Sequence, residues 1–447
     1  MIRPTDARVR PRVWLLLLAL STWSLACVTP RTTRQDVSDD VRARTGATLR
    51  AQPSSTAFSL PDGVRLDDGL SEREAIATAL WNNGAFQSDL AQLDVARADL
   101  AEAALLPNPI LSLVFPLGPR QLAAAIAMPV DFLWQRPRRV ELAQRELARV
   151  GQTLVQGAID LARDARVAYL DAQLATERVR LTREALALLA QSRTITFARV
   201  ELGDAPPVEL ALLDADAAAI ETRAAQAAGE RDSALARLAR AMGAPRRARW
   251  ALAPFAPAPE RALSLDSLVE RALSSRPDVR AAEIAIEAAS ERVGWEKSRA
   301  WNLIALLDSG FTNNTFGASP GLRAELPLFS RNQGGISRAE AELSRASWRY
   351  VAVRQQVTAE VALALATFEQ AAAQRRIIEQ RELPAVERLA ARARQDQQLG
   401  ESAMIVVIDA TRRTVDVQAR LLESRGLAAR AWIELERSVG GMSHGSR

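Results

Sequence analysis

Hydrophobic residues recur every seven positions along two long segments of the chain, residues 136–201 and residues 338–399, which contain few glycines and prolines. The repeated positions are Val140, Leu147, Leu154 and Leu161 in the first segment and Leu343, Tyr350 and Val357 in the second. A seven-residue apolar repeat with charged residues between predicts supercoiled helices. At 1.5 Å per residue each helix would be roughly 90–100 Å long. We therefore expect rods that span a gap or enclose one.

The two long segments belong to two tandem copies of one unit. Leu202-Gly203-Asp204 is matched 197 residues later by Leu399-Gly400-Glu401, and Gly243 is matched by Gly440 at the same distance. A glycine after a helix supplies the left-handed residue that ends it. Each copy is therefore expected to contain a long helix, a sharp reversal and a return helix.

Each copy also contains a shorter first helix and a region with strand character. We expect the first helices at residues 71–104 and 264–300, each with a serine at its start. The strands are expected within about 108–129 and about 302–329, and the second pair is joined by a loop at 313–317. Soluble hairpins are the alternative explanation of these short strands.

The last expected strand, residues 321–329, alternates apolar and charged side chains. Leu322 and Ala324 alternate with Arg323 and Glu325, as expected for a strand with one face toward lipid and one toward water. Four strands cannot close a barrel, and a sheet in lipid must close. The pattern therefore favours several identical chains that share one barrel, and three chains would contribute twelve strands.

The N-terminus has the parts of an export signal. Basic residues up to Arg12 precede the apolar stretch 13–20, and Ser24-Leu25-Ala26-Cys27 follows. Cys27 is the only cysteine of the chain, and its position resembles that of the lipidated cysteine of a bacterial lipoprotein, although Ser24 and Leu25 are exchanged relative to the common order. We expect Cys27 to be lipid-modified; an incidental cysteine is the alternative. No later apolar run is long enough for a membrane-spanning helix.

These patterns divide the chain into six expected parts. The arm after the signal is rich in Pro, Ser, Thr and Arg, so it is expected to be a tether or to become ordered by docking. The parts are a signal peptide (1–26), a lipid-anchored N-terminal arm (27–65), the first repeat (66–243), a linker (244–262), the second repeat (263–440) and a tail (441–447).

Charge and composition exclude several classes of function. The formal net charge is +5, but arginines alternate with acidic residues, which favours solvated helix surfaces over a nucleic-acid interface. His444 is the only histidine, and no phosphate loop or nucleophile motif is present. Asp214 and Asp216 are expected on a solvated helix face. We therefore expect no enzyme, no cofactor and no metal site.

Two further stretches carry a resemblance to a known family. Pro327–Ile336 is similar to the strand-to-helix junction of TolC-family outer-membrane factors, the exit ducts of tripartite efflux pumps, and in particular to the heavy-metal branch of CzcC-like and CusC-like proteins. Glu382-Leu383-Pro384, just before Gly400, also resembles the family pattern. The resemblance covers about Leu66 to Gly440 in both copies.

The resemblance implies a fold, partners and a location. The fold is mainly α with a β-barrel part: each chain of a homotrimer would contribute four strands to a shared barrel and two coiled-coil hairpins to a periplasmic tunnel. The expected function is an outer-membrane channel subunit of a tripartite efflux pump, anchored in outer-membrane lipid of a Gram-negative bacterium. Its expected partners are a periplasmic adaptor (membrane fusion protein) and an inner-membrane pump, with no nucleic acid. A periplasmic lipid-anchored coiled-coil adaptor or scaffold protein is the alternative.

The helix reversals are the candidate sites under this resemblance, because they would form the periplasmic mouth. Asp204 and Glu401 are candidate entrance or gate residues, since a ring of carboxylates repels itself and attracts cations. Solvated helix caps are the alternative. The candidate adaptor contacts at the tips are Leu202, Gly203, Leu399 and Gly400. The sequence does not distinguish metal ions from drugs as the cargo.

Overall fold

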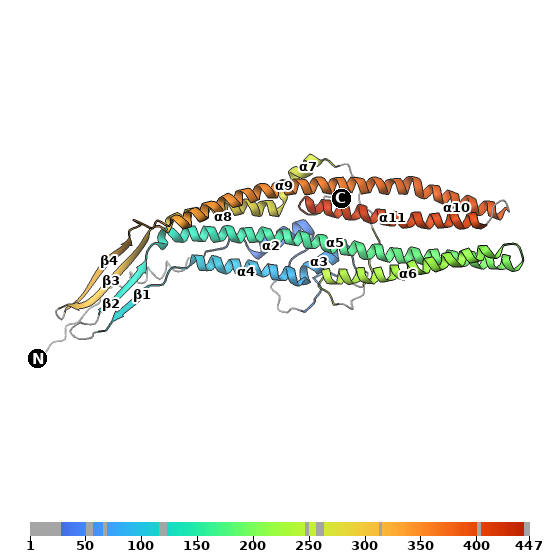
Figure 1. Cartoon of the computed structure of the whole chain (residues 1–447). Helices are drawn as coiled ribbons and strands as arrows, with labels where there is room; N and C mark the ends of the chain where they lie inside the picture. The colour runs from blue at the N-terminus through green and yellow to red at the C-terminus, as the bar shows by residue number, and fades with distance from the viewer. Residues whose placement is uncertain are drawn as a thin grey trace. The chain divides into compact units, whose positions relative to one another are not determined.

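The protein is mainly helical, and its described strands form one sheet (Figure 1). The computed structural model describes residues 28–50, 57–65, 69–115, 123–245, 250–255, 263–312, 315–399 and 404–441. The elements are α2 (Arg34–Thr45), α3 (Glu72–Asn82), α4 (Gly84–Ala104), β1 (Ile110–Val114), β2 (Ala123–Pro129), α5 (Phe132–Glu201), α6 (Pro207–Ala241), α7 (Leu265–Ser275), α8 (Pro277–Ser298), β3 (Asn302–Thr312), β4 (Thr315–Glu325), α9 (Gln333–Ile377), a π-helical segment η1 (Ile378–Glu382), α10 (Leu383–Gln398) and α11 (Met404–Ser438).

The described residues fall into two compact units. The first unit contains residues up to Arg34 together with 91–151 and 281–351, and so holds the sheet. The second unit contains residues 35–90, 152–280 and 352–447, and so holds both helix reversals. None of the described helices combines the length and the hydrophobicity of a membrane-spanning segment.

The two tandem copies predicted from the sequence are confirmed. Helices α3 and α7 each have eleven residues, and the return helices α6 and α11 each have thirty-five. Each copy contributes an antiparallel pair of strands, and β2 pairs with β3 to join the pairs into the order β1-β2-β3-β4. Strand β4 begins at Thr315 rather than at residue 321, so the predicted loop at 313–317 is too long.

The predicted first helices are each broken in two, which corrects the expectation of continuous helices at 71–104 and 264–300. In the first copy Asn83 has extended backbone, and its side-chain oxygen accepts hydrogen bonds from the backbone N–H groups of Ala85 and Phe86 at 3.1 and 3.2 Å. In the second copy the break is at Arg276, directly before Pro277, because a residue preceding proline is disfavoured in helical backbone.

Burial in the second long helix follows the predicted heptad from Val357 onward, whereas the earlier predicted positions Leu343 and Tyr350 are only half-buried. Side chains at successive steps of four and three residues are buried, namely Val357, Val361, Ala364, Phe368, Ala371, Arg375 and Ile378. The helix is not uniform, however, because η1 interrupts it just before Pro384. Pro384 has no N–H to donate to the helix. The N–H of the preceding residue, Leu383, donates to the carbonyl of Ile378, five residues earlier, which is the hydrogen bond of a π-helix. The corresponding part of α5 has no proline and stays α-helical.

Glycines end the long helices as predicted where the structure describes them. Gly203, Gly243 and Gly440 all have positive φ, at 78°, 63° and 100°. After Gly203 the N–H of Asp204 bonds back to the carbonyl of Arg199 at 2.8 Å, which is the pattern of a helix ended by a left-handed residue. Gly400 lies outside the described residues.

The N-terminal arm is docked and partly helical, rather than an irregular tether. Val37 and Val41 of α2 are buried, and the guanidinium of Arg44 donates to the carbonyls of Ser275 and Gly440 at 2.7 and 3.0 Å. These carbonyls lie at the ends of α7 and α11, where backbone acceptors have no partner within their helices. Arg44 therefore ties α2 to both repeats of the second unit.

Buried Arg276 makes a second contact of this kind with the end of α11. Its side chain is 2% exposed and pairs with Asp278 at 2.6 Å and Glu360 at 2.8 Å, and it also donates to the carbonyl of Ser438 at 3.0 Å. Burial alone would raise the pKa of Glu360, but hydrogen bonds from Arg276 and Gln356 outweigh it and hold that pKa below its ordinary value. The end of α11 is therefore held through charged groups.

Candidate functional site

The sheet of the first unit has two chemically different faces. Residues directly opposite one another on neighbouring strands point to the same face, so the register assigns each described side chain to a face. The face that we call the apolar face carries Leu111, Leu113, Ala124, Ile126, Met128, Leu303, Ala305, Leu307, Ser309, Ala318, Pro320, Leu322 and Ala324. Its one polar group, the hydroxyl of Ser309, donates to the carbonyl of Ala124 at 3.0 Å. This face can therefore lie against lipid without an unsatisfied side chain.

The opposite face, the polar face, carries all the ionisable side chains of the four strands. It includes Ser112, Asn302, Asp308, Ser319, Arg323 and Glu325. On the apolar face, Leu111 is 62% and Leu322 is 73% exposed in the isolated chain. A contiguous exposed apolar surface marks a contact with lipid or protein, and alternation across a strand is typical of membrane barrels. The predicted lipid-facing character of the strands is therefore supported over the soluble-hairpin alternative.

The sheet is open at both sides. Among the described strands, β1 pairs only with β2 and β4 pairs only with β3. Each edge strand therefore has a row of backbone N–H and C=O groups without partners among the described residues. In lipid such groups have no water to bind, so they must pair with other strands.

A buried carboxylate organises the junction between β4 and α9, the stretch that carries the family resemblance. Asn332 has left-handed backbone, with φ of 58°, and its side-chain amide donates to Glu296 Oε2 at 2.7 Å and to the Glu296 carbonyl at 2.9 Å. A side chain at position 335 would meet these two residues, with Glu296 Oε2 only 2.8 Å from an added Cβ. A side chain at position 335 would therefore have to displace Asn332 and Glu296, whereas Gly334 faces open space.

The first predicted tip is a sharp, solvent-exposed turn between α5 and α6. Leu202 is 76% exposed, Gly203 has open space around its Cα, and Asp204 is exposed. The Asp204 carbonyl accepts a hydrogen bond from Arg199 at 3.1 Å. The tip thus presents an apolar side chain, bare backbone and a carboxylate together, which suits the predicted contact and entrance roles without testing them.

The second predicted tip is described only up to its first residue. Leu399 is 65% exposed at the end of α10. Gly400 and Glu401 lie outside the described residues, as does Cys27. The predicted roles of these residues stay predictions.

Asp214 is exposed as expected, but an ion pair of Asp216 connects the two helix hairpins, which corrects the expectation of a solvated face for Asp216. Asp214 pairs with Arg193 of α5. Asp216 is only 16% exposed and pairs with Arg412 of α11. The sequence shows both acids, but their partners lie on other helices and have no fixed spacing from them.

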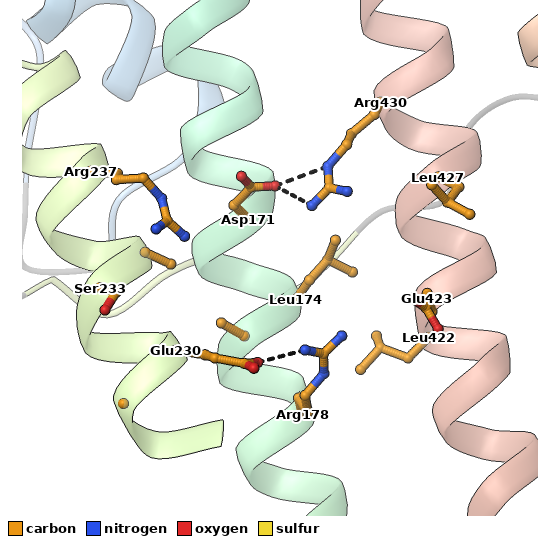
Figure 2. Close-up of a pocket in the computed structure, with 13 residues that line it drawn as sticks. Asp171, Leu174, Arg178, Glu230, Ser233, Arg237, Leu422, Glu423, Leu427 and Arg430 are labelled. Carbon is orange, nitrogen blue, oxygen red and sulfur yellow. Dashed lines mark hydrogen bonds and ion pairs between the residues drawn. The ribbon is translucent and has the colours of Figure 1, made fainter. Parts of the chain in front are cut away.

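A groove of about 560 Å³ lies between α5, α6 and α11 in the second unit (Figure 2). Two ion pairs cross it, Asp171 with Arg430 at 2.6 Å and Arg178 with Glu230 at 2.6 Å. Arg237 lines the same groove in Figure 2 and makes no ion pair within the described part of the chain. The residues that line the groove include no arrangement of nucleophile, base and oxyanion donors for catalysis.

No metal site was found among the described residues, where no group of three His, Cys, Asp or Glu side chains could hold an ion. The structure therefore offers surfaces as candidate sites: the two faces of the sheet, its open edges and the helix tips.

Comparison with known proteins agrees with this geometry. Residues 268–441 match the model of the outer membrane efflux protein family. The cobalt-zinc-cadmium resistance protein CzcC of Cupriavidus metallidurans is 25% identical over 387 residues, which cover 83% of this chain and 90% of that protein. The second copy thus matches the outer membrane efflux protein family, and the chain as a whole is similar to TolC-family outer-membrane factors.

Further relatives extend the match beyond one protein. The nickel-cobalt-cadmium resistance protein NccC of Alcaligenes xylosoxydans xylosoxydans is 28% identical over 282 residues, covering 60% of this chain and 63% of that protein. A crystal structure of CusC has the same fold, with a TM-score of 0.70 at 21% identity over 89% of this chain and 99% of that one. The predicted fold class is thereby confirmed.

These similarities confirm the predicted function and the predicted outer-membrane location, whereas the lipid anchor at Cys27 stays a prediction. The protein is an outer-membrane channel subunit of a tripartite efflux pump, and it extends into the periplasm. Asp308 and Glu296 were missed by the sequence analysis. A lone carboxylate within an apolar strand is the signal that could have found Asp308.

Proposed function

We propose that this chain assembles as a homotrimer whose duct exports divalent transition-metal cations, together with a periplasmic adaptor and an inner-membrane pump. The observation that carries the proposal is the sheet of the first unit, which joins an apolar face to two open edges. A sheet of this kind is stable in lipid only when its edges are paired.

Identical chains provide the simplest pairing. The free edge of β1 in one chain would pair with the free edge of β4 in the next, and three chains would give 3 × 4 = 12 strands. The apolar face would then turn to lipid and the polar face to the lumen, as in other membrane barrels. TolC-family channels are trimeric and work with adaptor and pump partners, which supports the same stoichiometry.

Metal cations are the cargo that the relatives favour. CzcC is named for resistance to cobalt, zinc and cadmium, and NccC for resistance to nickel, cobalt and cadmium. A duct needs no fixed ligands for such a cargo, because tight binding would slow its passage. The cargo would be pushed by the pump while the duct conducts passively.

The tips and the lipid anchor complete the proposal. Leu202, Gly203, Leu399 and Gly400 would contact the adaptor, and the carboxylates of Asp204 and Glu401 would line the periplasmic entrance. Cys27 would carry the lipid. Exposure of Leu202 and Leu399 supports the adaptor contact, since exposed apolar side chains at a helix reversal gain by burial against a partner.

The proposal is tested in a strain that lacks this protein. Deletion should lower the tolerated concentrations of zinc, cobalt, cadmium and nickel, and should leave tolerance of a panel of organic drugs unchanged. Expression of the wild-type chain should restore metal tolerance. A drug-only phenotype would refute the metal cargo, and a membrane-extracted protein that migrates as a monomer before and after heating would refute the trimer.

A further inference from the structure

One row of the polar face combines small side chains with a single carboxylate. Asp308 of β3 lies opposite Ala125 of β2 and Ser319 of β4, and Ala125 lies opposite Ser112 of β1. The row therefore runs across all four strands. None of its other side chains is large enough to cover the carboxylate, so Asp308 is exposed.

The adjacent rows of the polar face isolate this carboxylate. The next row toward the C-terminal ends of β1 and β3 holds Val114, Ala123, Gly310 and Gly317. The next row in the other direction, toward the strand ends that adjoin the helices, holds Ile110, Ala127, Leu306 and Gly321. None of these can ionise. Arg323 and Glu325 lie farther toward the helices, and their opposite charges cancel within the chain. Among the described residues, Asp308 makes no hydrogen bond or ion pair, so its charge faces water unneutralised.

We propose that Asp308 selects cations over anions inside the barrel. This inference rests on the proposed homotrimer, in which threefold symmetry would bring three copies of Asp308 to the same height. Rings of acidic side chains attract cations in other channels. The selecting position would thus lie in the barrel wall, far along the chain from the acidic tip residues Asp204 and Glu401.

The size of the barrel sets the magnitude of the effect. Twelve strands at roughly 4.8 Å spacing and about 40° tilt give a backbone diameter of roughly 24 Å, so the carboxylates would lie about 10 Å from the axis. The Debye length is about 10 Å at 0.1 M salt and about 3 Å at 1 M. Three charges at that distance raise the monovalent cation concentration on the axis about twofold at 0.1 M and lower the anion concentration equally.

The test is the reversal potential of the purified full-length trimer in planar bilayers under a KCl gradient. Near 0.1 M, Asp308→Asn should lower the potassium-to-chloride permeability ratio about fourfold, and near 1 M the difference from wild type should vanish. Adding Ser319→Asp to Asp308→Asn returns the charge to the same row on the next strand. The double variant should therefore recover the wild-type ratio, which a merely structural role of Asp308 would not predict.

The possible results separate the two proposals. Equal permeability ratios of wild type and Asp308→Asn near 0.1 M would overturn the selectivity role and leave the trimeric duct standing. Failure of Ser319→Asp to restore the ratio would also overturn it. A wild-type protein that forms no conducting trimer would overturn the proposed function and this inference with it.

Discussion

Replacing Arg276 with methionine should lower the thermal midpoint of the second unit by about 6 °C. Methionine keeps much of the side-chain volume but removes the charge that pairs with Asp278 and Glu360 and the donor to the Ser438 carbonyl. The two carboxylates would then remain partly buried without their main counter-charge.

The magnitude follows from the contacts that remain. Removing one partner of a buried ion pair costs about 3–5 kcal/mol. We take the lower end, because Glu360 keeps Arg437 at 3.3 Å and a hydrogen bond from Gln356 at 2.8 Å. In a unit of this size each kcal/mol shifts the midpoint by about 2 °C, so about 3 kcal/mol corresponds to about 6 °C.

The assay is a thermal unfolding curve of the detergent-solubilised protein, with Arg73→Met as the control. Arg73 is exposed on α3, so its replacement should change the midpoint little. The deficit of Arg276→Met should be full at pH 7. Because the pKa of folded Glu360 is depressed, the stability it contributes is present above its ordinary pKa and is lost as the pH falls through the lower, folded value. Equal thermal midpoints of Arg276→Met and Arg73→Met at pH 7 would refute the stabilising role of Arg276.

Three further predictions concern other parts of the chain. Cys27→Ser should abolish acyl labelling, and unchanged labelling would refute the lipid modification of Cys27. Combined Asp204→Ala and Glu401→Ala should change the single-channel conductance or cation preference, because an entrance ring would lose its charge; identical conductance with pump coupling intact would reduce both residues to ordinary helix ends. Gly335→Ala should cost about 1–3 kcal/mol by overpacking and lower the trimer yield, whereas Gly334→Ala should not; equal yields would contradict the packing argument.

The long helices and the strand faces could be predicted because each depends on a local period. The heptad stripe of α9 and the alternation around Leu322 in β4 both follow from spacing along the chain. The breaks at Asn83 and Arg276 were missed, although Pro277 was a usable signal. Sequence shows the proline at 384, but whether it kinks, ends or widens a helix depends on which carbonyls the neighbouring N–H groups reach.

The candidate site was predictable only where residues close in sequence form it. The tip of Leu202, Gly203 and Asp204 is a single turn, so its exposure could be expected from its glycine. Asp216 pairs with Arg412, which lies 196 residues away, and no local pattern specifies that pairing. The row of Asp308 likewise depends on strand register, which is set by pairing between the two copies.

The central claim, that one face of the sheet lies in lipid, is tested most directly at two adjacent leucines of β3. The register assigns Leu307 to the apolar face and Leu306 to the polar face. An arginine toward lipid near the bilayer midplane costs about 2–4 kcal/mol per site, and a trimer would carry three such sites. The measurement is the fraction of heat-modifiable trimer in outer membranes: Leu307→Arg should largely abolish it, and Leu306→Arg should preserve it. Equal trimer yields from the two variants would contradict the account.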